Sequence, residues 1–285
     1  MASYAQAINR ANKGCFVFLL DQSYSMEEPL GNSTRRKCDE LCTAVNAWVR
    51  NMTIRASGDE GIKDWLDVAV IGYRTDEQAK SIIESALAGP LAGKILLSNK
   101  ELGENPAGVD NVVQTFTDEE TQEIVEMPIQ APVWVTPRAE GGTPMCNVLD
   151  FAFPILEEWV QAHPKSFPPI VINITDGESQ DGDPIPYADA LKQLGTEDGN
   201  VLLFNCHLSM TASDPFLFPA SCEVLPDPLA RVLFEMSSPL PEAIVARANA
   251  EGFELPPNAR GMAFNADMVS LIKFLDMGTK PANLR

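Results

Sequence analysis

Short, continuous apolar runs alternate along the chain with segments in which apolar residues recur every three or four positions. The continuous runs are rich in β-branched side chains and are typical of strands buried on both faces, whereas the three-to-four spacing is typical of helices. Strands are predicted at 14–20, 66–73, 169–175, 201–208 and 261–265. Helices are predicted at 34–52, 144–160, 185–194, 228–236, 241–251 and 266–277. Buried strands that alternate with helices predict an α/β fold with a doubly wound, mostly parallel, Rossmann-like sheet and helices on both faces.

Two of the predicted helices carry further local signals. Asn32 or Ser33 is placed to cap the first helix, because a short polar side chain can accept a hydrogen bond from a free backbone N–H there. In the second helix, Pro144 suits the first turn, whereas Pro154 lies inside the apolar pattern. We therefore expect Pro154 to kink or restart that helix.

Residues 75–140 break the alternation. Short β-like runs separated by Gly, Pro and Asn occur there, at 94–98, 112–116, 123–129 and 133–136. The stretch from Asp76 to Glu140 carries 12 acidic and four basic residues. These features predict an inserted antiparallel β-ribbon, or strands that lengthen one edge of the sheet. We interpret the chain as one domain, 1–285, with a C-terminal helical extension, a core at about 14–74 and 141–277, and an insertion at about 75–140.

The net charge excludes some classes of binding partner and is compatible with others. The chain has 21 Lys and Arg against 40 Asp and Glu, which gives a formal net charge of −19. Nucleic acids and anionic membrane surfaces require clustered cations and are not expected as partners, whereas metal cations and basic protein surfaces stay open. Because 45% of the residues are hydrophobic, the charge does not indicate disorder.

No apolar run predicts a membrane span or a signal peptide. The longest run near the N-terminus, 15–20, ends at Asp21 and is far shorter than the ~18 residues that a spanning helix needs. The six cysteines are scattered and the chain has two histidines, so a zinc site is not expected. We expect a cytoplasmic protein with buried, reduced thiols.

Carboxylates and hydroxyls gather where the predicted strands end. Asp21, Ser23 and Ser25 follow the first strand, and Asp176 follows the strand at 169–175. Thr143 lies in a Gly-Gly-Thr-Pro turn before the second predicted helix. Ligands of open α/β sheets bind at the carboxyl ends of the strands, so we expect these five side chains to lie at one edge of the sheet.

Oxygen donors of this kind suit Mg²⁺, which takes six oxygens at about 2.1 Å and keeps several waters. The three hydroxyls can touch the ion directly, and the two aspartates supply charge either directly or through water. A coordination position stays open, which an Asp or Glu of a partner protein can fill. Mn²⁺ and Ca²⁺ are alternatives to Mg²⁺ at the same donors.

This constellation resembles the metal-ion-dependent adhesion site (MIDAS) of the von Willebrand factor A (vWA) family. The matching residues are Asp21, Ser23 and Ser25 in a D-x-S-x-S pattern, Thr143 in Gly-Gly-Thr-Pro, and Asp176 in Thr-Asp-Gly. The resemblance implies that the hydroxyls coordinate the ion directly, that the aspartates act largely through water, and that an acidic residue of a protein partner completes the shell. It covers the core but not the insertion.

The C-terminal part resembles the corresponding part of bacterial stand-alone vWA proteins of the TerY type, at 229–242 and 263–279. Such proteins are encoded beside protein phosphatases and kinases in tellurium-resistance and stress gene clusters. The resemblance implies a metal-dependent protein–protein interaction module or adaptor with no catalysis of its own. It implies a protein phosphatase, a protein kinase or an AAA-type ATPase as the partner.

The main alternative is a phosphatase or hydrolase that uses Asp21 as its nucleophile beside a Mg²⁺ site. Haloacid-dehalogenase-like enzymes carry D-x-D at the end of the first strand, because the second aspartate acts as the general acid and base. The corresponding residue here is Ser23, so that group is missing. A serine hydrolase is disfavoured because the stretch 177–181 lacks the second glycine of G-x-S-x-G.

Three cations, Arg35, Arg36 and Lys37, begin the first predicted helix beside the expected metal site. They are either ordinary solvated charges or a feature that draws an acidic partner toward the metal. Two carboxylates of the 176–183 loop, Glu178 and Asp181, are either solvated or support the site from behind the metal donors.

Overall fold

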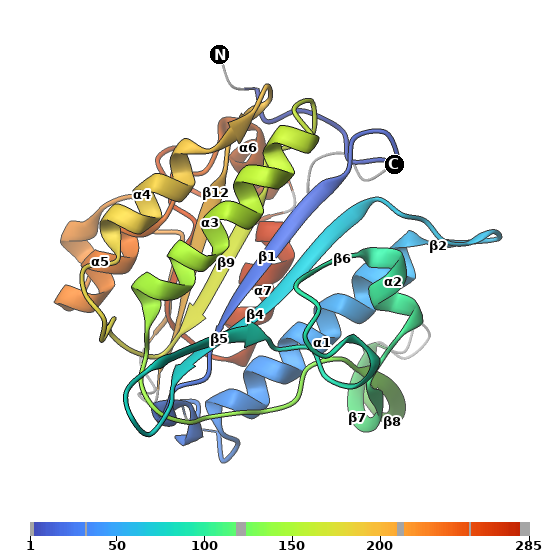
Figure 1. Cartoon of the computed structure of the whole chain (residues 1–285), viewed down its shortest axis with the longest axis horizontal. Coiled ribbons are helices and arrows are strands. Elements are labelled where there is room, and N and C mark those ends of the chain that lie inside the picture. Colours follow the sequence, from blue (N-terminus) through green and yellow to red (C-terminus); the bar gives the residue numbers. More distant parts are fainter. Residues whose placement is uncertain (1–2, 32, 118–123, 210–213, 251, 280–285) are drawn as a thin grey trace.

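The computed structural model describes residues 3–31, 33–117, 124–209, 214–250 and 252–279. Within these ranges, five parallel strands form the centre of an eight-stranded mixed sheet (Figure 1). The parallel strands are β1 (Gly14–Asp21), β4 (Leu66–Thr75), β9 (Ile170–Thr175), β12 (Leu202–Leu208) and β14 (Met262–Ala266). The chain therefore has the α/β, mostly parallel, Rossmann-like architecture that its sequence predicts.

The order of the parallel strands places a topological switch point beside β1. The sheet runs β14-β12-β9-β1-β4, so the chain moves from β1 to one neighbour, β4, and later returns to pair β9 on the other side. Phe16 pairs with Val68 of β4 and with Ile170 of β9. In doubly wound sheets of this order, the crevice for a ligand lies at the carboxyl ends of the two strands where the order reverses.

Antiparallel strands extend both edges of the sheet. β13 (Phe216–Leu217) pairs with β14, and β5 (Ser81–Ser85) and β6 (Leu96–Ser98) both pair with β4. β7 (Gly108–Thr117) and β8 (Ile124–Val133) form a separate antiparallel ribbon. The segment 75–140 thus contains both a ribbon and edge strands, which the sequence offered as alternatives. It also holds β5 and a short helix, α2 (Asn99–Glu104), that the sequence pattern did not predict.

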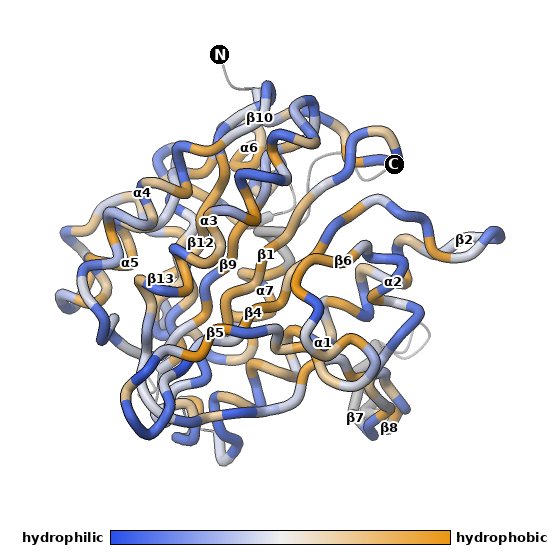
Figure 2. The backbone as a smooth tube through the Cα atoms, in the orientation of Figure 1, coloured by the Kyte–Doolittle hydropathy of each residue, from blue (hydrophilic) through white to orange (hydrophobic). Residues whose placement is uncertain are grey.

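Helices cover the two faces of the sheet (Figure 1). One core packs α1 (Lys37–Ala56), α6 (Glu242–Ala250) and α7 (Met268–Thr279) against Phe16, Phe18 and Leu20 of β1. The other packs α3 (Met145–Ala162), α4 (Ile185–Gln193) and α5 (Pro228–Met236) against the alternate residues Val17 and Leu19. Because successive strand residues face opposite sides, a strand buried on both faces is apolar throughout, as the central strands are in Figure 2.

The remaining elements are short connectors: β2 (Ser57–Gly58), β3 (Gly61–Ile62), β10 (Gly195–Thr196), β11 (Gly199–Asn200), and the 3₁₀ helices η1 (Tyr24–Glu27), η2 (Gly89–Leu91) and η3 (Cys222–Val224). No helix in the described ranges combines the length and apolarity needed to cross a membrane.

The structure corrects the predicted start of the first helix and excludes a restart of the second at Pro154. Helix α1 begins at Lys37 rather than at residue 34, and its N-cap is Arg36, whose side chain makes no capping hydrogen bond. Ser33 instead accepts from the backbone N–H of Arg35, ahead of the helix, and Asn32 lies outside the described residues. Helix α3 runs through Pro154 without restarting. Apolar side chains on both sides of Pro154, including Leu149 and Leu156, are fully buried, and this burial offsets the roughly 3 kcal/mol that an interior proline costs a helix.

Candidate metal centre

Three loops meet at the carboxyl edge of the sheet, beside the switch point. The first follows β1 and continues into η1, the second precedes α3, and the third follows β9. Tyr24 N–H donates to the carbonyl of Gly141 over 2.9 Å, which ties the first loop to the second. Gln180 N–H donates to the carbonyl of Thr143 over 3.0 Å, which ties the third loop to the second. Backbone hydrogen bonds therefore hold the predicted donors on one framework.

Four of the five predicted donors are joined by a continuous set of hydrogen bonds. Ser23 N–H donates to Asp21 Oδ1 over 2.8 Å, and the hydroxyls of Ser23 and Ser25 lie 3.1 Å apart. Ser25 Oγ in turn donates to Asp176 Oδ1 over 2.7 Å. Because the proton of Ser25 is used by Asp176, the hydroxyl of Ser23 is the donor to Ser25. The ends of β1 and β9 thus present two carboxylates and two hydroxyls in direct contact.

Thr143, the fifth predicted donor, is buried against the loop that carries Asp176. Its hydroxyl lies 3.8 Å from the point where a Cβ on Gly177 would stand, and its side chain is almost fully enclosed. Its backbone N–H donates to Gln180 Oε1 over 3.2 Å. The structure therefore brings all five predicted residues to the same edge of the sheet.

Glycine is required at the turn before Thr143. Gly141 has a φ of +65°, and a Cβ there would stand 2.0 Å from the carbonyl oxygen of Thr75. The next residue, Gly142, donates its N–H to Thr75 Oγ1 over 2.7 Å. A side chain at 141 would force this turn away from the end of β4, and Thr143 would move with it.

Asp181 is a structural residue of the site that the sequence alone did not resolve. Its two carboxylate oxygens accept from the backbone N–H groups of Cys146 and Asn147, each over 2.9 Å, so it caps the start of α3 from another loop. The two loop carboxylates considered from sequence are both exposed, and Asp181 is the one that caps the helix following Thr143. Asp181 lies 35 positions after Cys146, so the sequence around the start of α3 contains no pattern that marks it as the capping residue.

Asp21 is a fully enclosed carboxylate. Its Oδ2 accepts from the hydroxyl of Thr175 over 2.6 Å. Burial, together with the negative charge of Asp176, raises the pKa of Asp21 to about 6, against the opposing effect of the hydrogen bonds from Thr175 and Ser23. Among the residues that the structure describes, no Lys, Arg or His side chain forms an ion pair with Asp21. The charge of its ionised form is therefore not balanced by any side chain in direct contact.

Asp176 differs from Asp21 because it contacts a cation. Lys37 Nζ lies 2.6 Å from Asp176 Oδ2, and the two side chains are 3% and 0% exposed. Of the two alternatives considered for the three cations, ordinary solvated charge does not apply to Lys37. Arg36 makes ion pairs with Glu27 and Asp39, each over 2.8 Å, on the outside of the same turn.

The donors fit a hard divalent cation. Two carboxylates and three hydroxyls share one edge, and the two acids carry one negative charge more than Lys37 balances. Within the described ranges, no group of three or more His, Cys, Asp or Glu side chains is placed to hold a metal ion, so the shell would draw part of its oxygens from hydroxyls. Oxygen donors with excess negative charge are the chemistry that Mg²⁺, Mn²⁺ or Ca²⁺ prefers.

His207 and five of the six cysteines are buried. His207 is 7% exposed and stacks on Phe264, with ring centroids 4.3 Å apart. Burial lowers its pKa to about 4, despite the charge and a backbone hydrogen bond of Asp176. The six cysteines are free thiols, and all except Cys222 are buried. The expected core imidazole and buried thiols are thus present in this structure.

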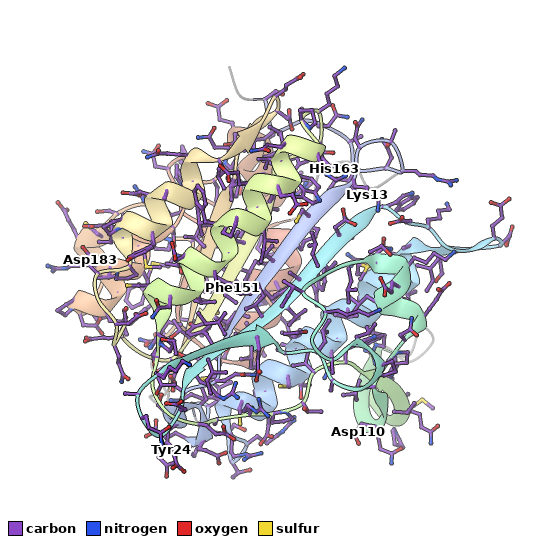
Figure 3. The ribbon with its side chains drawn as sticks, in the orientation of Figure 1. Lys13, Tyr24, Asp110, Phe151, His163 and Asp183 are labelled. Carbon is purple, nitrogen blue, oxygen red and sulfur yellow. The ribbon has the colours of Figure 1, made fainter. Side chains whose placement is uncertain are left out.

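An exposed aromatic side chain stands at the same edge. Tyr24, between the two serines of the first loop, is 71% exposed and projects from the lower end of the molecule in Figure 3. An exposed ring of this size next to enclosed oxygen donors offers a contact surface to a partner.

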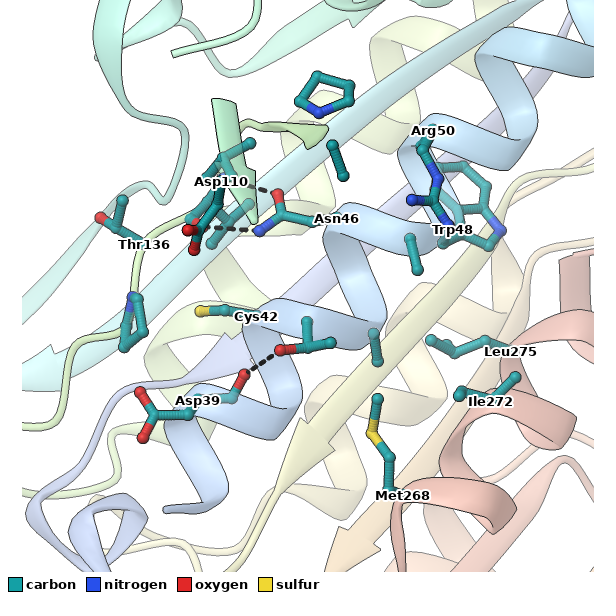
Figure 4. Close-up of a pocket in the computed structure, with 18 of the residues that line it drawn as sticks. Asp39, Cys42, Asn46, Trp48, Arg50, Asp110, Thr136, Met268, Ile272 and Leu275 are labelled. Atoms are coloured by element: carbon teal, nitrogen blue, oxygen red, sulfur yellow. Dashed lines mark hydrogen bonds between the residues drawn. The ribbon is translucent and has the colours of Figure 1, made fainter. Parts of the chain in front are cut away.

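A cavity of about 660 Å³ lies along α1, away from the five donors (Figure 4). It lies between α1, α7 and the end of the β7–β8 ribbon, and its lining includes Asp39, Cys42, Asp110 and Met268. Asn46 fixes the chain that leaves the ribbon: its Oδ1 accepts from the N–H groups of Trp134 and Val135 over 2.9 and 3.0 Å. The lining of this cavity includes none of the five predicted donors.

The fold and the donor set define a Rossmann-like α/β protein with a cluster of oxygen donors at its switch point. The sequence matches no protein-family model and no curated protein. Among solved structures, the pilus adhesin SpaC from Lactobacillus rhamnosus GG is similar over 71% of this chain, with 12% sequence identity and a TM-score of 0.38. This chain spans 25% of the length of that adhesin. A likeness at this TM-score gives no information on function.

Proposed function

We propose that this chain is a metal-dependent protein–protein interaction module, in which Asp21, Ser23, Ser25, Thr143 and Asp176 hold Mg²⁺, with Mn²⁺ or Ca²⁺ as alternatives. The observation that carries the proposal is the chain of hydrogen bonds from Asp21 through Ser23 and Ser25 to Asp176, which joins two enclosed carboxylates of which only Asp176 contacts a cation. A bound divalent cation supplies the missing positive charge and an open position for an anionic oxygen.

The ligand that suits such a position is a carboxylate of a partner protein. Backbone hydrogen bonds within this chain join the three loops that carry the donors, which supports a donor set arranged before any partner binds. The exposed ring of Tyr24 beside it provides apolar contact area around that carboxylate. These features suit recognition of an Asp or Glu that protrudes from another protein surface.

The resemblance to the MIDAS of the vWA family supports the same function. In this proposal the chain is a vWA-type protein, similar to the TerY type, that acts in the cytoplasm within a bacterial stress-response or signalling system. A protein phosphatase, a protein kinase or an AAA-type ATPase is the proposed class of partner. Nucleic acid and membranes are not proposed as partners.

A phosphohydrolase that uses Asp21 as its nucleophile is the competing function. Asp21 is 0% exposed, and each of its oxygens accepts one hydrogen bond, from Ser23 and from Thr175. Ser23 stands where such enzymes carry the aspartate that acts as general acid and base, which favours a role for Asp21 in binding a cation. Turnover of p-nitrophenyl phosphate by the wild type, lost in Asp21→Asn, would establish the enzyme instead.

The proposed function is tested by measuring metal binding and partner binding on the same variants. Wild-type protein is expected to bind Mg²⁺ in isothermal titration calorimetry, and Asp21→Ala and Thr143→Ala are expected to bind it at least about 100-fold more weakly, because each loses a donor of the same site. Partner capture is expected in Mg²⁺, not in EDTA, and not by either variant.

The matched control is Glu178→Gln, which removes an exposed carboxylate two residues after Asp176. It is expected to bind metal and partner as the wild type does. If Asp21→Ala and Thr143→Ala captured the partner equally well with Mg²⁺ and with EDTA, the interaction would not depend on this site and the proposal would fail.

A further inference from the structure

Lys37 is a buried cation in the first turn of α1, in contact with one of the proposed metal donors. Its Nζ donates to Asp176 Oδ2 over 2.6 Å, to Glu28 Oε2 over 3.0 Å and to the carbonyl of Ser25 over 3.3 Å. These three acceptors use all three N–H bonds of the ammonium group. The side chain is therefore fixed at the site instead of extending into solvent.

Local physical chemistry disfavours lysine at this position. Burial of an ammonium group costs free energy unless the charge is paired, and a cation in the first turn of a helix opposes the helix dipole. The N-cap residue Arg36 offers no side-chain acceptor to the free N–H groups of this turn. Residues that break local rules in this way are expected at functional sites, where a specific charge is required.

The charges of the site show what Lys37 changes. Asp21 and Asp176 carry two negative charges, and Lys37 carries one positive charge between Asp176 and Glu28. Glu28 is 46% exposed and screened by water, so the enclosed charges are those of Asp21, Asp176 and Lys37. With a divalent cation bound, these enclosed groups have a net charge of about +1, and one incoming carboxylate neutralises it. Without Lys37, the same loaded site would already be neutral.

We propose that Lys37 is an internal counter-ion that weakens the binding of the divalent cation and strengthens the binding of a carboxylate to the loaded site. This inference rests on the function proposed above and specifies its ligand as a single carboxylate. Lys37 acts through Asp176: it holds Oδ2 of that side chain, while Oδ1 accepts from Ser25. It is thus a positioning residue that also sets the charge of the site.

The test uses Lys37→Gln, which keeps an N–H donor for Asp176 and removes the charge. Its affinity for Mg²⁺ in isothermal titration calorimetry is expected to rise about tenfold, because a nearby positive charge no longer repels the cation. Acetate is the carboxylate probe, and its methyl proton line is broadened when it binds to Mn²⁺ held by the protein. The acetate affinity of Lys37→Gln is expected to fall at least about threefold.

Lys13→Gln is the matched control. Lys13 also contacts two carboxylates, Asp64 and Asp67, but it lies at the opposite end of β1. Both affinities of this variant are expected to equal those of the wild type. The opposite directions expected for Lys37→Gln separate the proposal from a structural defect, which would weaken both affinities together.

Each other result has a defined meaning. If Lys37→Gln binds Mg²⁺ with wild-type or lower affinity, Lys37 is not a counter-ion, whereas metal binding by the wild type leaves the proposed function intact. If neither protein binds Mg²⁺ or Mn²⁺, the proposed function fails and the role of Lys37 fails with it.

A second pair of variants covers the case in which Lys37→Gln does not fold. Asp176→Asn is compared with the double variant Lys37→Gln/Asp176→Asn, in which the contact between the two side chains is retained without any charge. Binding of Mn²⁺, followed by electron paramagnetic resonance, is expected to be about tenfold tighter in the double variant. Equal binding by the two would overturn the proposal.

Discussion

The two ends of strand β1 each join a lysine to two carboxylates, and they do so in opposite ways. At the amino end, Lys13 lies 2.7 Å from Asp64 and 3.1 Å from Asp67, with side chains that are 21%, 39% and 14% exposed. At the carboxyl end, Lys37 contacts Asp176 and the partly exposed Glu28, while a further carboxylate, Asp21, is enclosed without an ion pair among the described residues. Lys13 and Tyr24 mark these two ends in Figure 3.

The difference in burial between the two ends of β1 determines whether an excess negative charge requires a further cation. Burial acts to lower the pKa of Lys13, yet its contacts with Asp64 and Asp67 raise it overall, so one lysine serves both carboxylates. Water screens the charge that is left over. At the carboxyl end, Asp21 is 0% exposed and forms no ion pair among the described residues, so it is an enclosed carboxylate with a raised pKa. The position of the charges, more than their number, makes one end a candidate metal centre.

The largest expected effect is on stability when each lysine is replaced. In metal-free buffer, Lys37→Met is expected to lower the free energy of unfolding by about 3–5 kcal/mol, because Asp176 is left buried without its partner. Lys13→Met is expected to cost about 1 kcal/mol or less, as partly exposed ion pairs do. Urea unfolding of the two variants measures this difference.

Saturating Mg²⁺ is expected to restore much of the stability of Lys37→Met and to leave Lys13→Met unchanged. Equal losses in the two variants would show that the two ends of β1 do not differ as described. A loss in Lys37→Met that Mg²⁺ does not reduce would separate the lysine from the proposed metal.

The next effect is a pH dependence with two opposing contributions. The folded pKa of Asp21 is raised to about 6, so the folded state holds a proton that the unfolded state releases, and the stability from Asp21 is lost as the pH rises from about 4 to 6. The folded pKa of His207 is lowered to about 4, so its contribution runs the other way and is lost as the pH falls from about 6.5 to 4. Each contribution is at most about 3 kcal/mol.

Metal-free variants separate the two contributions. Relative to the wild type, Asp21→Asn is expected to become more stable with rising pH between 4 and 6, and His207→Gln less stable. Chemical denaturation at several pH values measures both slopes. Identical slopes in the wild type and in Asp21→Asn would contradict the enclosed state of Asp21.

The smallest expected effect is a difference in the loss of stability when either of two glycines with a positive φ is replaced by alanine. Gly141, at the carboxyl edge, meets the carbonyl of Thr75, whereas Gly93 has no atom within 4 Å of an added Cβ. Gly93→Ala is expected to cost about 1 kcal/mol for the backbone alone, and Gly141→Ala about 2 kcal/mol or more, together with weaker binding of Mg²⁺. Thermal unfolding and calorimetry report the two effects, and equal costs would show that the turn before Thr143 tolerates a side chain.

The sequence predicted the framework because the framework depends on local patterns. Strands buried on both faces are apolar in continuous runs, so β1, β4, β9, β12 and β14 were found within one or two residues of their bounds. The positions of the site residues followed from a general rule about strand ends, applied to the loops after β1 and β9. Their proximity is now visible, while their metal-binding role stays a prediction.

What the sequence did not reveal depends on contacts between distant segments. Lys37 was considered part of a cationic run, and its burial follows from Asp176, which lies 139 residues further along. Asp181 caps a helix that begins before it in the chain, so no N-cap pattern marks it. The helix through Pro154 and the first turn of α1 likewise depend on tertiary packing, which overrides local preference.

The hydrogen bonds of Asn46 with Trp134 and Val135 join α1 to the segment 75–140, so this segment cannot be removed without affecting α1. Leu91, Leu97 and Trp134, all from the segment 75–140, are buried in the same apolar core as Trp48 of α1. Deletion of that segment would leave one side of α1 in water, and Lys37 stands in the first turn of the same helix. The insertion is thus part of the scaffold that holds the candidate metal centre, and a shortened protein that lacks it is not a neutral background in which to study the site.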